Sequence, residues 1–258
     1  MKTLRLIWVG LWLNAKMLSV NRFFLMTSVV QPVIFATIAF FLFRAGARRE
    51  SLLYVALGAG LMGIWSTTLF SAGGMLRWQR NVGTLEIAVA APPPLLLVIG
   101  PMTLGIGAIG LYSVAATLVW GWALFDVPLS FEHPLLFLLA MPATILALAS
   151  FGLVLAASFI HYRHTNALGN LLEYPVWLAS GLLVPLSLLP PWVEPLAWTI
   201  APTWGVRAVR ESALGGDPVL AIAMCVGLTA VYLGVASVLL RYFERLARRD
   251  ATLALTAG

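Results

Sequence analysis

The sequence predicts an all-α integral membrane protein with six transmembrane helices. Of its 258 residues, 61% are apolar and only 10% are charged, whereas soluble domains carry roughly 25% charged residues. A helix needs about 20 mostly apolar residues to cross a bilayer, and suitable segments follow one another at 23–43, 51–72, 95–120, 135–160, 168–189 and 218–240. Because they use nearly all of the length, we expect one membrane domain over residues 1–258 and no soluble catalytic domain.

Residues 1–22 are predicted to form an elbow helix in the membrane interface. Apolar residues recur there at helical spacing, at Leu4, Trp8, Leu11 and Ala15. Trp8 and Trp12 carry amphipathic rings, which favour the interface. A signal peptide is the alternative for a basic and then apolar start, but the tryptophan positions fit the elbow helix better.

Residues 23–189 are predicted to hold five spans. The first span contains Gln31 before Pro32, which predicts a kink or a polar contact inside the bundle. The second carries Gly58, Gly60 and Gly63, and small residues let helices approach closely in lipid. Gly73-Gly74 is predicted to end that helix as it leaves the membrane.

A polar segment at residues 76–92 interrupts the apolar pattern after the second span. It carries Arg77, Arg80 and Glu86, with Gly83 between them. Charged residues are poorly suited to face lipid, so we predict a short helix over about residues 75–91 that lies in the membrane surface and faces a soluble partner. Three prolines at 92–94 then form a stiff corner before the third span.

Prolines also disrupt the region around residues 180–214, at Pro185, Pro190, Pro191, Pro195 and Pro202. The segment 190–214 is still apolar and aromatic. We predict two short re-entrant helices there that dip into the outer leaflet and return, because broken backbone at membrane depth needs cover from protein or water. The sixth span over 218–241 and a cytoplasmic tail over 242–258 complete the chain.

The basic residues predict the orientation. With the N-terminus inside, eleven of the sixteen lysines and arginines fall on the cytoplasmic side and five fall outside, so both termini are predicted to be cytoplasmic. The arginines of the loop at 44–49 argue the other way. The net charge of +6 reflects these span ends, and we expect no nucleic-acid partner.

Common catalytic and nucleotide-binding motifs are absent from the sequence. Lys2 and Lys16 are the only lysines, so a phosphate-binding loop ending in Gly-Lys-Ser/Thr is impossible. If ATP drives the protein, another chain binds it. Glu173 is the one acid expected within or at the edge of a span; it is either functional, as buried carboxylates in lipid tend to be, or interfacial near Arg163 or the polar segment.

Two stretches of the chain carry recognisable motifs. The first is Arg80-Asn81-Val82-Gly83-Thr84-Leu85-Glu86, followed by Ala91-Pro92. The second is Ser180-Gly181 followed by Pro185, Pro190-Pro191 and Ala201-Pro202, with Arg207 and Arg210 beyond. In these stretches the chain resembles the permease subunits of type-2 ABC exporters (ABC-2 type transporters), and the resemblance covers essentially the whole chain, in the order and spacing of its segments.

The resemblance implies roles for three sets of residues. A coupling helix would transmit the closure of an ATPase through Arg77, Trp78, Arg80, Asn81, Gly83, Thr84, Leu85 and Glu86. An extracytoplasmic gate would use Pro190, Pro191, Trp192, Pro195, Trp198, Pro202, Arg207 and Arg210. Polar residues of the pathway would be Gln31, Glu173, Ser180 and Gly181.

The resemblance also implies the partners. These are two cytoplasmic ABC ATPase subunits, which would bind the ATP and magnesium, and a second permease, identical or related, within the lipid of the inner (cytoplasmic) membrane. This chain itself would hold no cofactor, no metal and no catalytic residue.

The substrate is indicated more weakly. Few charges lie in the spans, which favours a hydrophobic or amphipathic substrate, and the match is closer to the drug and antibiotic exporter branch than to the glycan branch. A polysaccharide or glycolipid exporter of the same family is one alternative, because 10 tryptophans and 13 phenylalanines would suit a sugar tunnel. An ion-driven secondary transporter is another, with Glu173 as its intramembrane acid. A lipid-modifying enzyme would need a cluster of acids, histidines or a metal site, and none appears in the sequence.

Overall fold

The computed structural model is a bundle of α-helices. It describes residues 2–45, 51–81, 83, 87, 90–91, 93–159, 165–182, 186 and 189–250. The helices are α1 Lys2–Val20, α2 Arg22–Ala45, α3 Ser51–Asn81, α5 Leu95–Ile109, α6 Leu111–Phe125, α7 Pro134–Phe159, α8 Thr165–Ala179, α9 Val193–Ala197, α10 Ala201–Leu214 and α11 Val219–Asp250. These ranges contain no strand, so the described part of the chain confirms the all-α prediction.

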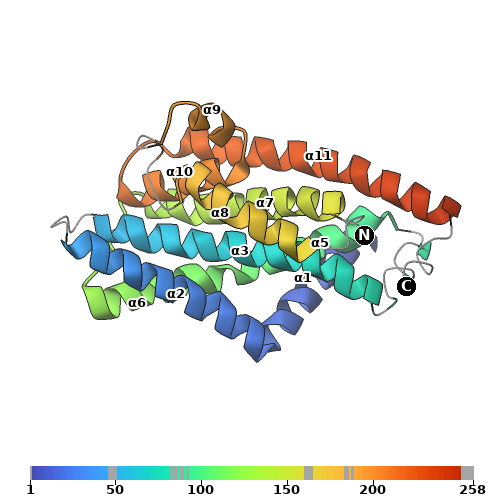
Figure 1. The fold of residues 1–258 in the computed structure, drawn as a ribbon, viewed down its shortest axis with the longest axis horizontal. Coiled ribbons are helices and arrows are strands. Elements are labelled where there is room, and N and C mark those ends of the chain that lie inside the picture. The colour runs from blue at the N-terminus through green and yellow to red at the C-terminus, as the bar shows by residue number, and fades with distance from the viewer. Residues whose placement is uncertain are drawn as a thin grey trace.

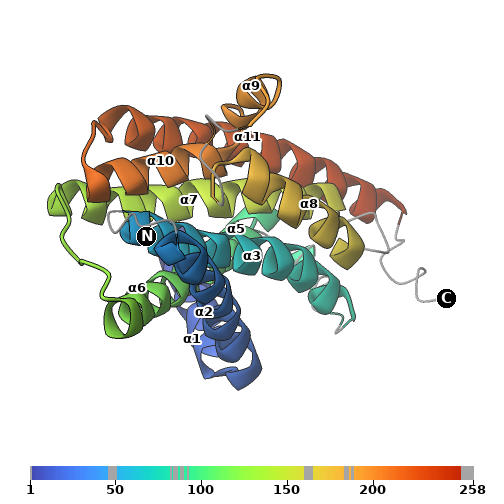
Figure 2. The same cartoon turned by 60° about the vertical axis from the view of Figure 1, so that its left-hand side comes forward.

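Helix α3 forms the centre of the bundle. It lies between α2 and α6 on one side and α7 and α10 on the other, as both views show (Figures 1 and 2). Within its apolar stretch Leu52–Leu69, 94% of the residues are buried. The largest fully buried side chains include Trp65, Leu57 and Ile64 of this helix. Any movement of α3 therefore has to be shared by the helices that surround it.

Close helix packing explains two of the three glycines of the second predicted span. A Cβ atom on Gly60 would lie 2.7 Å from Val114 Cα, and one on Gly63 would lie 2.5 Å from the side chain of Ser113. The absence of a side chain thus lets α3 approach α6 closely, which confirms the expected packing role of these two glycines. Gly58 contacts a different partner, which the next subsection describes.

The third predicted span, 95–120, is broken into two helices in the structure. Helix α5 ends at Ile109 and α6 begins at Leu111, with Gly110 between them. A Cβ on Gly110 would lie 2.9 Å from Ile64 Cα of α3. The two helices together form one apolar stretch, Leu95–Phe125, so the prediction was right about the apolar segment but missed the break and the end at Phe125.

Helix α1 packs along α5. The amide of Asn14 donates a hydrogen bond of 2.6 Å to the carbonyl oxygen of Met102, and Gly10 faces Pro101. The opposite side of α1 is exposed and apolar, with Trp8 and Trp12 67% and 51% exposed. The helix has the extent and the two-sided character expected of an elbow helix, while its position in a membrane interface stays a prediction.

Four segments of the described chain are long and apolar enough to cross a membrane: Leu52–Leu69, Leu95–Phe125, Pro134–Ser158 and Val219–Leu246. A shorter apolar stretch, Ser28–Leu42, lies in α2. The fifth predicted span, 168–189, differs most, because α8 ends at Ala179 and a turn follows. At roughly 1.5 Å per residue, its 15 residues reach about 23 Å and fall short of a bilayer core of about 30 Å. Six spans therefore remain a prediction.

Candidate functional site

The segment predicted to face a soluble partner begins as a direct extension of α3. This helix passes through Gly73-Gly74 and ends only at Asn81, so the prediction that the two glycines end it is wrong. Each glycine weakens a helix by about 1 kcal/mol, but the last turns gain tertiary contacts. Gln79 is buried, and its amide donates to the sulfur of Met102 on α5 at 3.4 Å.

The single helix predicted over about residues 75–91 is divided by a turn at Gly83. Arg77, Trp78, Arg80 and Asn81 belong to the end of α3. Gly83 has a φ of +75°, a backbone region that residues other than glycine rarely adopt. Helical geometry is present again at Ile87 and Ala90, and the amide of Ala91 donates to the carbonyl of Ile87 at 3.0 Å.

The other predicted coupling residues, Thr84, Leu85 and Glu86, lie outside the described residues. Ile87, directly after them, is 70% exposed. The described part of this segment is thus a helix end joined by a glycine turn to a short helical piece with an exposed apolar side chain.

The predicted gate segment, 190–214, contains two helices of unequal burial. The short α9 and the residues before it lie at the surface, where Pro190, Pro191 and Pro195 are exposed and Trp192 is 70% exposed. Helix α10 is buried against α3, α7 and α11 over most of its length. Pro202 lies in its first turn, where a missing N–H and a fixed φ favour helix initiation.

A cluster of aromatic and charged side chains joins these two helices. The indole N–H of Trp204 donates to the carbonyl of Trp198 at 2.9 Å, and the two rings are 4.8 Å apart. Arg207 lies over both rings, 5.6 and 5.9 Å from their centroids. The cluster connects the end of α9 with α10.

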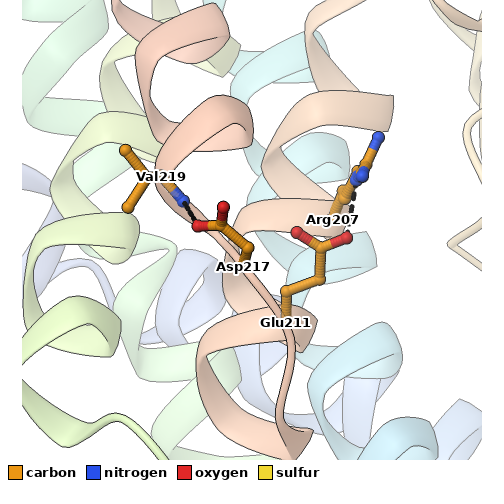
Figure 3. A network of polar contacts seen from close by, with 4 residues as sticks. All are labelled: Arg207, Glu211, Asp217 and Val219. Atoms are coloured by element: carbon orange, nitrogen blue, oxygen red, sulfur yellow. Dashed lines mark hydrogen bonds and ion pairs between the residues drawn. The ribbon is translucent and has the colours of Figure 1, made fainter.

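Arg207 also pairs with Glu211, one turn further along α10, at 2.6 Å (Figure 3). In the same view Asp217 accepts a hydrogen bond of 3.1 Å from the amide of Val219 and so caps the start of α11. The side chain of Arg207 is 38% exposed and that of Glu211 24%, so solvent weakens this ion pair.

Arg210 lies in a different environment, because it is buried to 7% exposure inside the bundle. Its guanidinium donates to the carbonyl oxygens of Gly181 and Leu182 at 2.6 and 2.9 Å, just after the end of α8. It also donates to the carbonyl of Tyr54 on α3 at 3.4 Å and lies 3.4 Å from the centroid of that ring. One side chain of α10 thus connects the gate segment with both α3 and α8.

The predicted pathway residues fall into two groups. Glu173 is buried to 3% exposure and accepts a hydrogen bond of 2.5 Å from the hydroxyl of Ser66 on α3. Ser180 is buried, and Gly181 adopts a φ of +79° where α8 has ended. Gln31 is exposed on α2, and the other residues that the structure describes as exposed between Met26 and Leu42 are apolar.

Sequence reasoning missed two residues of this arrangement, Tyr54 and Ser66, and did not identify the neighbours of Gly58. Ser66 sits in an apolar run without any motif, and only the fold brings it to Glu173. Gly58 is closely packed, as expected, but the neighbours that it makes room for are the Arg210 guanidinium and the carbonyl oxygen of Leu182. No pattern in the sequence indicates that an arginine of the gate segment lies beside this glycine.

The described part of the chain is an all-helical bundle with long apolar helices and buried polar contacts, which is typical of a membrane protein. The ABC-2 type transporter family model matches residues 5–214, and the chain therefore belongs to that family. Membership makes it the membrane permease component of an ABC transporter, which is a transport and not a catalytic component, and it implies partnership with an ABC ATPase subunit. A search of curated proteins found no match to the chain.

Proposed function

We propose that this chain is the permease of an ATP-driven exporter, and that the end of α3 and the turn at Gly83 form its coupling element. The observation that carries this proposal is the continuity of α3. The helix that bears Arg77, Trp78 and Arg80 is the same helix that forms the buried centre of the bundle. A displacement of its end by a partner would move the core as a rigid body, which is the kind of two-state element that coupling requires.

The proposed contact with the ATPase has two parts. Arg77, Arg80, Asn81, Thr84 and Glu86 supply orientation-specific polar contacts, and Trp78, Leu85 and the exposed Ile87 supply an apolar anchor. Gly83 sets the angle between the two pieces. ATP and magnesium bind to two cytoplasmic ATPase subunits, and this chain carries no cofactor.

The remaining architecture follows the sequence prediction, with six crossings, an interfacial elbow at α1 and both termini in the cytoplasm. Residues 190–214 form the extracytoplasmic gate, and Arg210 connects this gate to α3 and to the end of α8. A second permease, identical or related, completes the path along the side of α2 and α8. The lone exposed amide of Gln31 among apolar residues supports that location.

The substrate we propose is hydrophobic or amphipathic, such as a drug or antibiotic. The gate and bundle bury few charges, and the exposed surfaces of α2 and α8 are mainly apolar, with Ile34, Ile38, Leu171 and Leu178. Such a path suits a molecule that partitions into the membrane.

The first experiment is purification of the tagged chain in mild detergent with identification of the proteins that accompany it and an ATPase assay. We expect a stoichiometric ABC ATPase. Glu86→Arg should retain membrane insertion but uncouple ATP hydrolysis from transport, because the change reverses a charge at the proposed contact. Transport at the wild-type rate in this variant would show that this segment is not the coupling element.

A further inference from the structure

Glu173 is the only acidic side chain that the described part of the chain buries. Its partner there is the hydroxyl of Ser66, at 2.5 Å. No lysine or arginine among the described side chains pairs with it, since the ion pair found there joins Arg207 and Glu211. A buried carboxylate without a cation is unfavourable in a membrane protein and usually has a function.

Aromatic side chains lie within one helical turn of Glu173. Trp177 lies one turn further along the same face of α8, and its ring is 5.3 Å from that of Phe35 on α2 and 5.1 Å from that of Tyr174. The buried indole N–H of Trp177 and the buried hydroxyl of Ser180 have no partner among the described residues. Aromatic faces beside a carboxylate attract organic cations, and unpartnered polar groups can be satisfied by a ligand.

Exposed residues of α8 lie close to Glu173 in the sequence. Leu171 and Tyr174, on either side of Glu173 in the sequence, are 66% and 56% exposed. Helices α2 and α8 run in the same direction along the bundle (Figure 1). Gln31 precedes Phe35 by one turn, as Glu173 precedes Trp177, so the exposed amide lies toward the same end of the bundle as the buried carboxylate. Phe35 of α2 contacts Trp177 of α8 at this level, and in the inference below the site opens to a ligand when these two helices separate there.

We infer that Glu173, together with Ser66 and Trp177, binds the charged group of a lipophilic organic cation. This inference rests on the proposed function, because it names the class of molecule that an exporter path along α2 and α8 would carry. The carboxylate supplies the counter-charge, the aromatic rings enclose the apolar part around the cation, and the Ser66 hydroxyl holds the carboxylate when the site is empty.

The test uses two ions of nearly the same shape and opposite charge, tetraphenylphosphonium and tetraphenylborate. Binding of each to the full chain in lipid nanodiscs is measured by equilibrium dialysis, with empty nanodiscs to subtract lipid partition. We expect Glu173→Gln to lower the affinity for tetraphenylphosphonium at least tenfold and to leave tetraphenylborate binding unchanged or tighter. Equal affinity of this variant and the wild type for the cation would overturn the inference.

Control variants separate charge from folding. Glu173→Asp keeps the charge and should retain part of the cation affinity, whereas Glu132→Gln removes an exposed acid of the loop before α7 and should change nothing. A wild-type chain that fails to bind the cation but purifies with its ATPase would overturn the cation site and leave the proposed function in place. Cation binding by a chain that never associates with an ATPase would support the cation site and overturn the proposed function.

Discussion

The guanidinium of Arg210 fills the space that a side chain on Gly58 would need. A Cβ atom on Gly58 would lie 2.5 Å from Nη2 of Arg210 and 2.7 Å from the carbonyl oxygen of Leu182. The guanidinium reaches the backbone beyond α8 only because α3 has no side chain at this position. The central helix, the gate helix and the end of α8 therefore meet at a glycine, and a change there should affect all three.

Replacement of Gly58 by alanine should displace Arg210. Overpacking of a close-packed interior costs about 1–3 kcal/mol, and here the strained neighbours are a guanidinium and a backbone carbonyl. We expect a lower thermal unfolding midpoint and a gate segment that is cut more rapidly by protease. Gly100→Ala is the matched control, because Gly100 is also a buried helical glycine but has no atom of the described residues within 4 Å of an added Cβ. Equal behaviour of the two variants would contradict this account.

Arg210 should matter more than Arg207 although both lie on α10. Arg210→Met leaves the buried carbonyls of Gly181 and Leu182 without a donor, at about 1–3 kcal/mol for each unsatisfied group. Arg207→Met removes a half-exposed pair with Glu211, a kind of contact worth about 0–1 kcal/mol. Thermal unfolding of both variants in the same detergent gives the comparison. A larger loss in Arg207→Met would show that the aromatic cluster holds the gate and Arg210 does not.

The apolar runs and the prolines predicted much of the fold. The start of α3, the placement of α11 and the presence of two helices within 190–214 follow from composition and local backbone chemistry. These features depend on residues near one another in the sequence, so the sequence reveals them.

The errors arose where tertiary contacts outweigh local preference. Gly73-Gly74 does not end α3, because the following turn is held by Gln79 against Met102. The apolar stretch 95–120 is broken at Gly110, where α3 passes close to its backbone. The pairing of Ser66 with Glu173 joins residues 107 positions apart, and no local pattern could indicate it.

Substitutions of Gly83 should act through the backbone conformation that they allow and not through the volume of the new side chain. Its φ is +75°, and no atom of the described residues lies within 4 Å of an added Cβ. The left-handed conformation costs L-residues about 1–2 kcal/mol, but asparagine tolerates it better than β-branched residues do. We expect Gly83→Val to reduce transport per ATP hydrolysed, and Gly83→Asn to retain most of it. If the two variants are equally active, the turn does not set the coupling geometry.

Cysteine labelling should establish the orientation of the chain. Cys225 is the single cysteine and is fully buried, so maleimide should leave the native protein unlabelled and react only after denaturation. New cysteines at the exposed positions Glu132 and Arg245 then report the two sides of the membrane. Because the basic residues concentrate at the predicted cytoplasmic ends, Glu132→Cys should react with an impermeant maleimide in intact cells and Arg245→Cys only in inside-out vesicles. The reverse pattern would place both termini outside and remove the α3 end from reach of any cytoplasmic ATPase.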